Sequence, residues 1–383
     1  MDRRLLVLLS GVLMSTVNES SLAPALPVLA RTFAVGPEAA QGVVSLGLLG
    51  AALAYLPVTA LAGRVGARRL FRLGILLHAL FALGLALAPG LFWLYLFRFL
   101  QGVAAAMVVG LVPGLAATAL PEARGFALGM VASTVAAGTL LGPALGGLAA
   151  GLGLAYVFLL PLPLALLALL LALPKGSGLP ELPPQEGSLG RLLQAPGFLK
   201  ALLATGLYFL HTLGTTVALA LHLGTEGLSS QAIGGLLLLG PFQLLLLGAW
   251  AGRVADRLGY RRVALLGAYL LVGAGVGFAL FPLLHPFWGA ALGLVLLGVG
   301  RALFQAANNA LVLSLAPPGT EGLASGALSV ARSLGQALGS ALAGGSLGLF
   351  YRLLPHPGLA FAATALLLTG LMAFSAFLMR SGE

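Results

Sequence analysis

From residue 125 to residue 174 the chain contains no Asp, Glu, Lys or Arg. A helix that crosses the hydrocarbon core of a bilayer needs about 20 apolar residues, so this stretch has room for two crossings. Apolar stretches of similar length recur along the whole chain, which predicts a membrane protein of many helices. We place twelve spans at residues 5–30, 38–62, 70–89, 92–119, 125–152, 154–173, 197–223, 230–252, 262–282, 288–315, 322–349 and 356–379.

The composition agrees with a membrane setting. Hydrophobic residues make up 60% of the chain and charged residues only 8%, whereas about 25% of the residues in a soluble domain are charged. We therefore expect an all-α integral membrane fold. There are no cysteines, which excludes disulfides and thiolate metal sites.

The net charge of +10 is explained by topology. With the N-terminus in the cytoplasm, the basic residues outside the spans gather on the cytoplasmic side, as the positive-inside rule requires. These are Arg3, Arg4, Arg64, Arg68, Arg69, Arg72, Arg124, Lys175, Arg191, Lys200, Arg253, Arg257, Arg261, Arg262 and Arg380. Only Arg31 and Arg352 fall on the opposite side. Both termini are thus expected in the cytoplasm of a bacterium, and no nucleic-acid partner is implied.

The chain reads as two copies of one unit. A shift of 197 residues places Gly138 on Gly335 and Gly142 on Gly339, and the polar stretch 174–196 lies between the copies. We expect an N-terminal six-helix bundle at 1–173, a cytoplasmic linker at 174–196 and a C-terminal six-helix bundle at 197–383. In parallel repeats of this kind the substrate path runs between the halves, near the middle of the bilayer.

A glycine string in the fifth span carries the first family resemblance. Its members are Gly129, Gly138, Gly142, Pro143, Gly146 and Gly147. Gly138, Gly142 and Gly146 lie four residues apart, so they share one helix face and allow another backbone to pack closely. The string resembles the antiporter motif of drug:proton exporters in the major facilitator superfamily. A plain packing face of small residues is the alternative.

A second resemblance lies in the loops between the second and third spans of each half. The later copy matches the superfamily loop pattern GxxxDRxGRR except at Tyr260, through Gly252, Asp256, Arg257, Gly259, Arg261 and Arg262. The earlier copy keeps Arg64, Gly66, Arg68 and Arg69. Thr59 and Gly63 replace its leading glycine and its aspartate. The glycine before the next helix permits a sharp turn, and the arginines can anchor at the headgroups. Basic anchors on a plain turn are the alternative.

The fourth span resembles the family motif RxxQGxxxA through Arg98, Gln101 and Gly102. In the family this arginine is tied to proton coupling. Glu19 is the one acidic residue well inside a span, and a carboxylate at that depth is a functional hypothesis by default. We therefore assign proton coupling to Glu19 and Arg98. A permanent ion pair between them, or a first helix that ends early and leaves Glu19 in water, is the alternative.

Further polar residues at membrane depth are candidates for the substrate cavity. They are Asn18, Gln101, His211, Arg301, Gln305, Asn308, Asn309 and Arg332. The run from Arg301 to Asn309 could line a polar path on the tenth span. Structural roles for the arginines and a packing role for His211 remain open. One carboxylate against three arginines suits a neutral or anionic substrate better than a cation.

These observations predict a secondary active transporter that exports small lipophilic or amphipathic molecules by alternating access, in exchange for protons. A proton-coupled or facilitative carrier of a metabolite, such as an organic anion or a sugar, is the alternative. Short loops poor in catalytic groups argue against an enzyme. The expected partners are the lipid bilayer and a small-molecule substrate, with no cofactor besides the coupling proton, and we expect a monomer in the inner membrane.

Overall fold

The computed structural model describes residues 3–120, 124–172, 179, 181, 189–317 and 320–380, and the secondary structure of these residues is entirely helical. The first half contains α1 (Arg3–Ser20), η1 (Ala23–Ala25), α2 (Leu26–Thr32), α3 (Pro37–Val65), α4 (Ala67–Ala86), α5 (Leu91–Val109), α6 (Val112–Ala119), α7 (Arg124–Leu152), α8 (Leu154–Leu159) and α9 (Pro161–Ala172). The second contains α10 (Leu189–Leu193), α11 (Phe198–Thr225), α12 (Ser230–Leu237), α13 (Leu239–Leu258), α14 (Tyr260–Leu284), α15 (Pro286–Ser314), α16 (Glu321–Leu353) and α17 (Pro357–Arg380).

Several spans are built from two or three helical elements in line. The first span is α1, η1 and α2, and the fourth is α5 and α6. Pro24, Pro27 and Pro113 stand at these breaks, where a missing N–H cannot continue the helical ladder. The sequence places the spans correctly, but the breaks divide the predicted spans 5–30, 92–119, 154–173 and 230–252.

Eleven of the described helical segments are long and apolar enough to cross a membrane. The predicted span outside this set is the one in α16, a helix of 33 residues that carries Arg332, Gln336 and many glycines and serines. α16 packs against α11 on one side and α3 on the other. Its low hydropathy therefore reflects its enclosed position at the junction of the halves.

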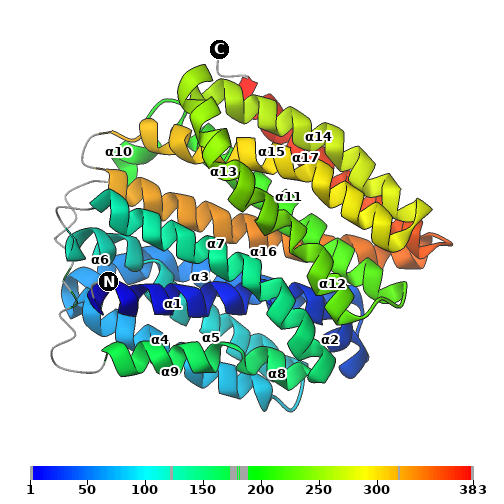
Figure 1. Cartoon of the computed structure of the whole chain (residues 1–383), viewed down its shortest axis with the longest axis horizontal. Coiled ribbons are helices and arrows are strands. Elements are labelled where there is room, and N and C mark those ends of the chain that lie inside the picture. The colour runs from blue at the N-terminus through cyan, green and yellow to red at the C-terminus, as the bar shows by residue number, and fades with distance from the viewer. Residues whose placement is uncertain are drawn as a thin grey trace.

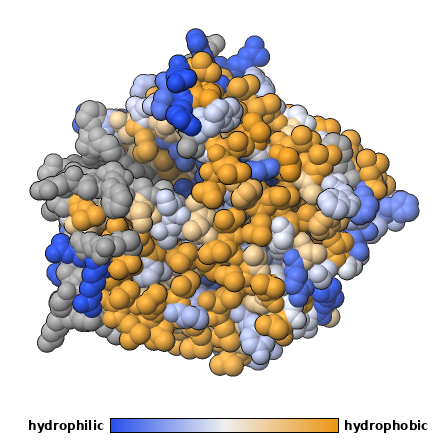
Figure 2. Space-filling model, in the orientation of Figure 1, coloured by the Kyte–Doolittle hydropathy of each residue, from blue (hydrophilic) through white to orange (hydrophobic). Residues whose placement is uncertain are grey.

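The helices run roughly parallel to the long axis of the molecule (Figure 1). We call the end that carries the start of α1 and the α3–α4 turn the terminal end, and the end that carries the α2–α3 and α16–α17 turns the distal end. Hydrophobic side chains cover the broad middle of the face in Figure 2, and hydrophilic ones gather toward the ends. Leu76, Leu246 and Phe377 are among the large apolar side chains that are exposed at the surface of the molecule.

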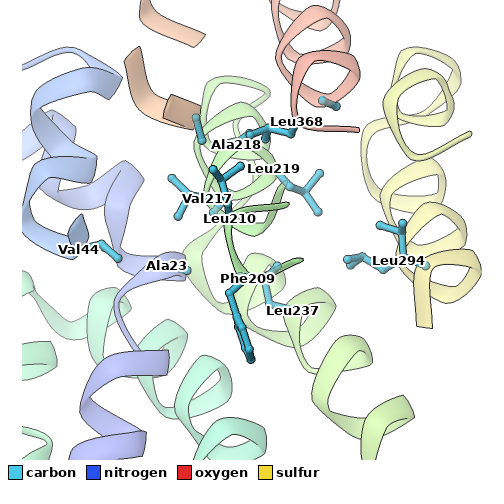
Figure 3. Close-up of a cluster of buried hydrophobic side chains, with 14 of the residues drawn as sticks. Ala23, Val44, Phe209, Leu210, Val217, Ala218, Leu219, Leu237, Leu294 and Leu368 are labelled. Carbon is cyan, nitrogen blue, oxygen red and sulfur yellow. The ribbon is translucent and has the colours of Figure 1, made fainter. Parts of the chain in front are cut away.

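Hydrophobic packing joins the two halves at the distal end. One buried cluster combines C-terminal helices with the distal parts of α3, α4, α5 and α7. Figure 3 shows Ala23 and Val44 of the first half beside Leu210 and Val217 of α11. Toward the terminal end, the described residues form separate clusters, one in the first half with Val330 of α16 at its edge and one around α10, α11 and α16.

Polar contacts also close the distal end. Arg352 of α16 forms an ion pair with Glu38 of α3, with Nη2 and Oε1 3.0 Å apart. Ser340 Oγ lies 3.3 Å from Gln41 Oε1, within hydrogen-bond distance. The described contacts between the halves are thus concentrated at this end, and the molecule is closed there.

Candidate functional site

The break in the first span places two polar side chains near the middle of the bundle. α1 ends at Ser20, so Asn18 and Glu19 occupy its last turn. Pro24 and Pro27 follow within the next turns. The helix is therefore interrupted between Ser20 and Ala23, directly after the turn that carries Glu19.

The guanidinium of Arg98 of α5 makes hydrogen bonds within the first half. Its Nε donates to the carbonyl of Val43 of α3 at 3.1 Å, and its Nη1 donates to Oε1 of Gln101. Asn18 Nδ2 donates to the same oxygen at 3.2 Å. Arg98 is 4% exposed and Gln101 fully buried. This network ties α1, α3 and α5 together.

Two glycines make room for this network. A Cβ at Gly47 of α3 would lie 2.9 Å from Arg98 Nε, and a Cβ at Gly102 of α5 would collide with the carbonyl of Gly47. The α3 and α5 backbones therefore approach closely where the guanidinium crosses, as small residues allow in membrane helices. The fourth-span motif thus acts here as a packing and hydrogen-bonding unit.

Glu19 faces a cavity at the boundary between the halves. Its side chain is exposed although it lies inside a span. The cavity, of about 30 Å³, is also lined by Tyr55 and His78 of the first half and by Ser333 of α16.

No basic side chain of the described residues approaches the Glu19 carboxylate within 4.0 Å. The charges of Arg98 and Arg332 act on it from further away. The permanent ion pair with Arg98 considered above is therefore absent. The other alternative holds in part, because α1 does end within a residue of Glu19.

In the second half, polar side chains of α15 bind to α11. Arg301 Nη2 donates to Thr215 Oγ1 at 3.3 Å, and Tyr208 Oη lies 3.1 Å from Gln305 Oε1. A Cβ at Gly240 of α13 would lie 3.1 Å from Arg301 Nη1. Arg301 therefore sits among α11, α13 and α15.

The predicted polar path along the tenth span is only partly realised. Asn308 is buried and donates to Thr205 Oγ1 at 2.8 Å and to the carbonyl of Ala201 at 3.3 Å, so it joins α15 to α11. Asn309 is half-buried and has no hydrogen-bond partner among the described residues. Gln305 is the other half-buried amide of this run.

His211 is fully buried, and its two ring nitrogens have no hydrogen-bond partner among the described residues. The packing role left open for it fits this position better than substrate contact. Arg332 of α16 is half-buried. Its guanidinium carbon lies 5.2 Å from the centre of the Phe209 ring, a cation–π arrangement.

The glycine string of α7 packs against two different helices. A Cβ at Gly138 or Gly142 would collide with Thr16 or Ser20 of α1, and one at Gly146 with the carbonyl of Ser21. The close-packing face that the four-residue spacing predicts is therefore real. The Gly129 position lies in α7, but its surroundings are outside the described part of the structure.

The glycine string also predicts that Gly142 and Pro143 act in close packing at the interface between the halves, and for Gly142 this prediction is wrong. Gly142 faces α1 of its own half. The inter-half contact is made by Gly147, which lies against Ser230 of α12, and by the carbonyl of Pro143, which lies against Gly234. Residue spacing defines the face but not the partner of each residue on it.

The second half repeats this packing. A Cβ at Gly335 or Gly339 of α16 would collide with backbone carbonyls of α11, and one at Gly344 with Gln41 of α3. The pairs Gly142–Gly339 and Gly147–Gly344 thus make equivalent contacts in the two halves. The repeat detected in the sequence is present in the geometry.

The two loop motifs form tight turns through glycines. Gly66 has φ +96° and Gly259 has φ +90°, values that glycine adopts at little cost. Each ends one helix and begins the next. The half-buried Gly252 has open space around its Cα, and Arg69, Asp256, Arg257 and Arg262 are exposed. The side chain of Arg64 lies outside the described residues.

Two arginines of the loop motifs bind other segments of the chain, in addition to any contact with lipid headgroups. Arg261 Nη2 donates to the carbonyl of Met379 at 2.6 Å, at the end of α17, where a cation is favoured by the helix dipole. The equivalent Arg68 forms an ion pair with Glu181, with Nε and Oε1 2.7 Å apart. Asp256 accepts a hydrogen bond from Tyr260 Oη at 3.3 Å.

Three contributors were missed by the sequence reasoning. Tyr55 and Ser333 face the Glu19 cavity from opposite halves, which no local spacing indicates. Glu181 is one acidic residue in a Pro- and Gly-rich linker, and nothing in that segment marks it as the partner of Arg68.

A sequence model of the Major Facilitator Superfamily matches residues 8–340. The riboflavin transporter RibZ of Clostridioides difficile is 26% identical over 389 residues, which cover 86% of this chain and 84% of RibZ. The multidrug resistance protein Stp of Mycobacterium tuberculosis is 34% identical over 166 residues, which cover 43% of this chain and 31% of Stp.

Among solved structures, the fold is similar to a bacterial homolog of the human lysosomal transporter Spinster in an inward-facing and occupied conformation. The TM-score is 0.80 with 17% identity, and the match covers 99% of this chain and 96% of the homolog. At that identity the likeness concerns the fold.

Proposed function

This chain belongs to the major facilitator superfamily, and from that premise we propose that it exports small lipophilic or amphipathic molecules across the bacterial inner membrane in exchange for protons. It is a multi-pass membrane transporter rather than an enzyme. The similarity to the multidrug resistance protein Stp supports drug-like molecules as the substrate class.

The observation that carries the proposal is the position of Glu19. Its carboxylate is at membrane depth, is exposed to the inter-half cavity and has no ion-pair partner among the described residues. A carboxylate in that position can hold a proton in one state and a positively charged or hydrogen-bond-donating substrate in another. Arg98 supports α1 through Gln101 and Asn18 rather than by pairing with Glu19.

The proposed topology follows from the basic residues. With the terminal end in the cytoplasm, the Arg352–Glu38 pair lies at the outer surface, so the molecule is closed toward the outside. Each copy of the chain contains both halves, and we propose that it acts as a monomer.

The excess of positive charge inside the spans favours a second candidate function. Glu19 shares the described spans with Arg98, Arg301 and Arg332, an excess of positive charge that a carrier of organic anions would use. Such a carrier would move protons with its substrate, whereas an exporter moves them in the opposite direction.

Transport in proteoliposomes tests the proposal. A pH gradient should drive uphill movement of amphipathic dyes by the natural chain, and Glu19→Gln should abolish it while the protein remains folded and still binds dye. Glu226→Gln, in the turn after α11, is the matched control and should transport normally. Full uphill transport by Glu19→Gln would refute the role of Glu19, and protons that move with the dye would favour the second candidate.

A further inference from the structure

Arg332 differs from the other two intramembrane arginines in how it is held. Arg98 donates to Val43 and Gln101, and Arg301 donates to Thr215. Arg332 donates to no acceptor among the described residues; its Nε is buried without a partner, a feature that it shares with Arg301. The face of Phe209 positions the guanidinium but leaves its N–H donors unused.

The location of Arg332 is at the boundary between the halves. α16 packs against α3 of the first half and α11 of the second, and Ser333, the residue after Arg332, lines the cavity that Glu19 faces. Glu19 therefore lies near two cations: Arg98, which is hydrogen-bonded within the first half, and Arg332, which comes from the other half and lacks a hydrogen-bond acceptor among the described residues. Glu19 and Arg332 are within electrostatic reach but are not in ion-pair contact.

A gap between unlike charges suits a ligand that carries both signs. A purely cationic substrate would match Glu19 but would bring a like charge to Arg332, and a misplaced like charge is strongly disfavoured. A purely anionic substrate would match Arg332 but would place a negative charge near Glu19. Because that charge favours the protonated carboxyl, the anion and the proton would travel together, in conflict with exchange.

We propose that the preferred substrates are amphipathic zwitterions, with the positive group at Glu19 and a carboxylate or similar anionic group at Arg332. The inference rests on the proposed exchange function and names its substrate class. The cationic group competes with the proton for Glu19, which gives exchange. The anionic group selects the substrate without entering that competition.

Three dyes of one scaffold family test the substrate class. A rhodamine with a free carboxylate is zwitterionic, its methyl ester is cationic, and fluorescein is anionic. In proteoliposomes with a pH gradient, the natural chain should move the zwitterion at least about tenfold faster than either relative. Titration of dye fluorescence in detergent should give the same order of affinities.

Variants of Arg332 test whether this residue causes the preference for the zwitterionic dye. Arg332→Gln should lower affinity for the zwitterion about tenfold and leave that for the ester unchanged or improved, whereas Arg332→Lys should retain part of the preference. Equal handling of zwitterion and ester by the natural chain, a preference for fluorescein, or an unchanged ratio in Arg332→Gln would each overturn the zwitterion proposal. Gradient-driven transport of the ester that depends on Glu19 would then leave the exchange function intact. Transport of all three dyes that ignores the gradient would overturn the exchange function as well.

Discussion

At the scale of single residues, Glu19 and Gln101 have contrasting surroundings. Glu19 is exposed to the cavity and unpaired among the described residues, while Gln101 is buried and its Oε1 accepts hydrogen bonds from Arg98 and Asn18. A buried guanidinium needs such acceptors, because an unsatisfied buried charge is expensive. The fourth-span motif therefore contains a glutamine because Arg98 needs the buried hydrogen-bond acceptor that Gln101 provides.

Gln101→Leu should destabilise the first half. The substitution removes the acceptor from Arg98 and Asn18 and leaves their donors buried, which costs about 1–3 kcal/mol for each such group. Thermal unfolding in detergent should show a lower transition temperature, with Gln101→Glu closer to the natural chain because it keeps an acceptor. Equal stability of Gln101→Leu and the natural chain would mean that water satisfies these donors.

At the scale of helices, the glycine face of α7 sets the position of α1. Gly138, Gly142 and Gly146 allow α1 to lie against α7 just where Ser20 ends the helix. Ser20 Oγ also lies 3.0 Å from the carbonyl of Gly138, within hydrogen-bond distance. The turn that carries Glu19 is thus fixed by α7 on one side and by Gln101 on the other.

Gly142→Leu should therefore act through α1. The new side chain collides with Ser20, and overpacking of this kind costs about 1–3 kcal/mol. We expect a less stable protein that binds dye but loses uphill transport, because the turn holding Glu19 is displaced. Gly370→Leu in α17, where the space beside the Cα is open, is the control for added bulk. Coupled transport by Gly142→Leu at the natural rate would contradict this packing role.

The linker contributes one described ion pair, between Glu181 and Arg68. Burial raises the pKa of Glu181, but hydrogen bonds from Arg68 and attraction to its guanidinium outweigh this and hold the pKa below its usual value. A lowered pKa stabilises the folded state above the pKa of the unfolded chain, and the contribution is lost as pH falls through the folded value.

Glu181→Gln should accordingly lower stability slightly at neutral pH and have no effect in acid. Because both side chains are more than 40% exposed, the loss should stay below about 1 kcal/mol. The measurement is the difference in unfolding temperature between Glu181→Gln and the natural chain, at neutral pH and at a pH well below the carboxyl pKa. A difference that persists in acid would assign the effect to something other than the charge.

Sequence patterns predicted the helices more accurately than the contacts that the helices make with one another. Apolar length located the spans, and the four-residue glycine spacing located the close-packing face of α7, because both are local properties of one helix. Whether Gly142 meets α1 or α12 depends on how helices are arranged, which spacing does not encode. The shared cavity of Tyr55 and Ser333 and the Glu181–Arg68 pair bring together residues far apart in the chain, so they became visible only in the structure.

At the scale of the whole molecule, the two ends differ in how closely the halves meet. The described halves meet at the distal end through the Glu38–Arg352 ion pair and the contact of Gly344 with Gln41. At the terminal end the hydrophobic clusters of the halves are largely separate. Alternating access requires a second state in which the terminal end closes and the distal contacts part.

Asp256 is the candidate latch of that second state. Its equivalent in the first half is Gly63, so the two loops differ in what they can bind. Asp256 is exposed here and accepts only from Tyr260 among the described residues. The pseudo-symmetry of the repeat would bring it to the start of α7 near Arg124, whose side chain lies outside the described residues.

A carboxylate at a partly buried helix N-terminus contributes about 1–2 kcal/mol, which shifts a balanced two-state equilibrium roughly five- to thirtyfold. Because the contact exists only when the terminal end is closed, Asp256→Asn should favour the state with that end open, and Gly63→Asp should favour the closed one. The chain has no cysteine, so cysteines introduced at the exposed Val65 and Leu193 can be spin-labelled selectively. The distance distribution between the labels should lengthen in Asp256→Asn and shorten in Gly63→Asp. An unchanged distribution in Asp256→Asn would leave the aspartate as a local support for the α13–α14 turn.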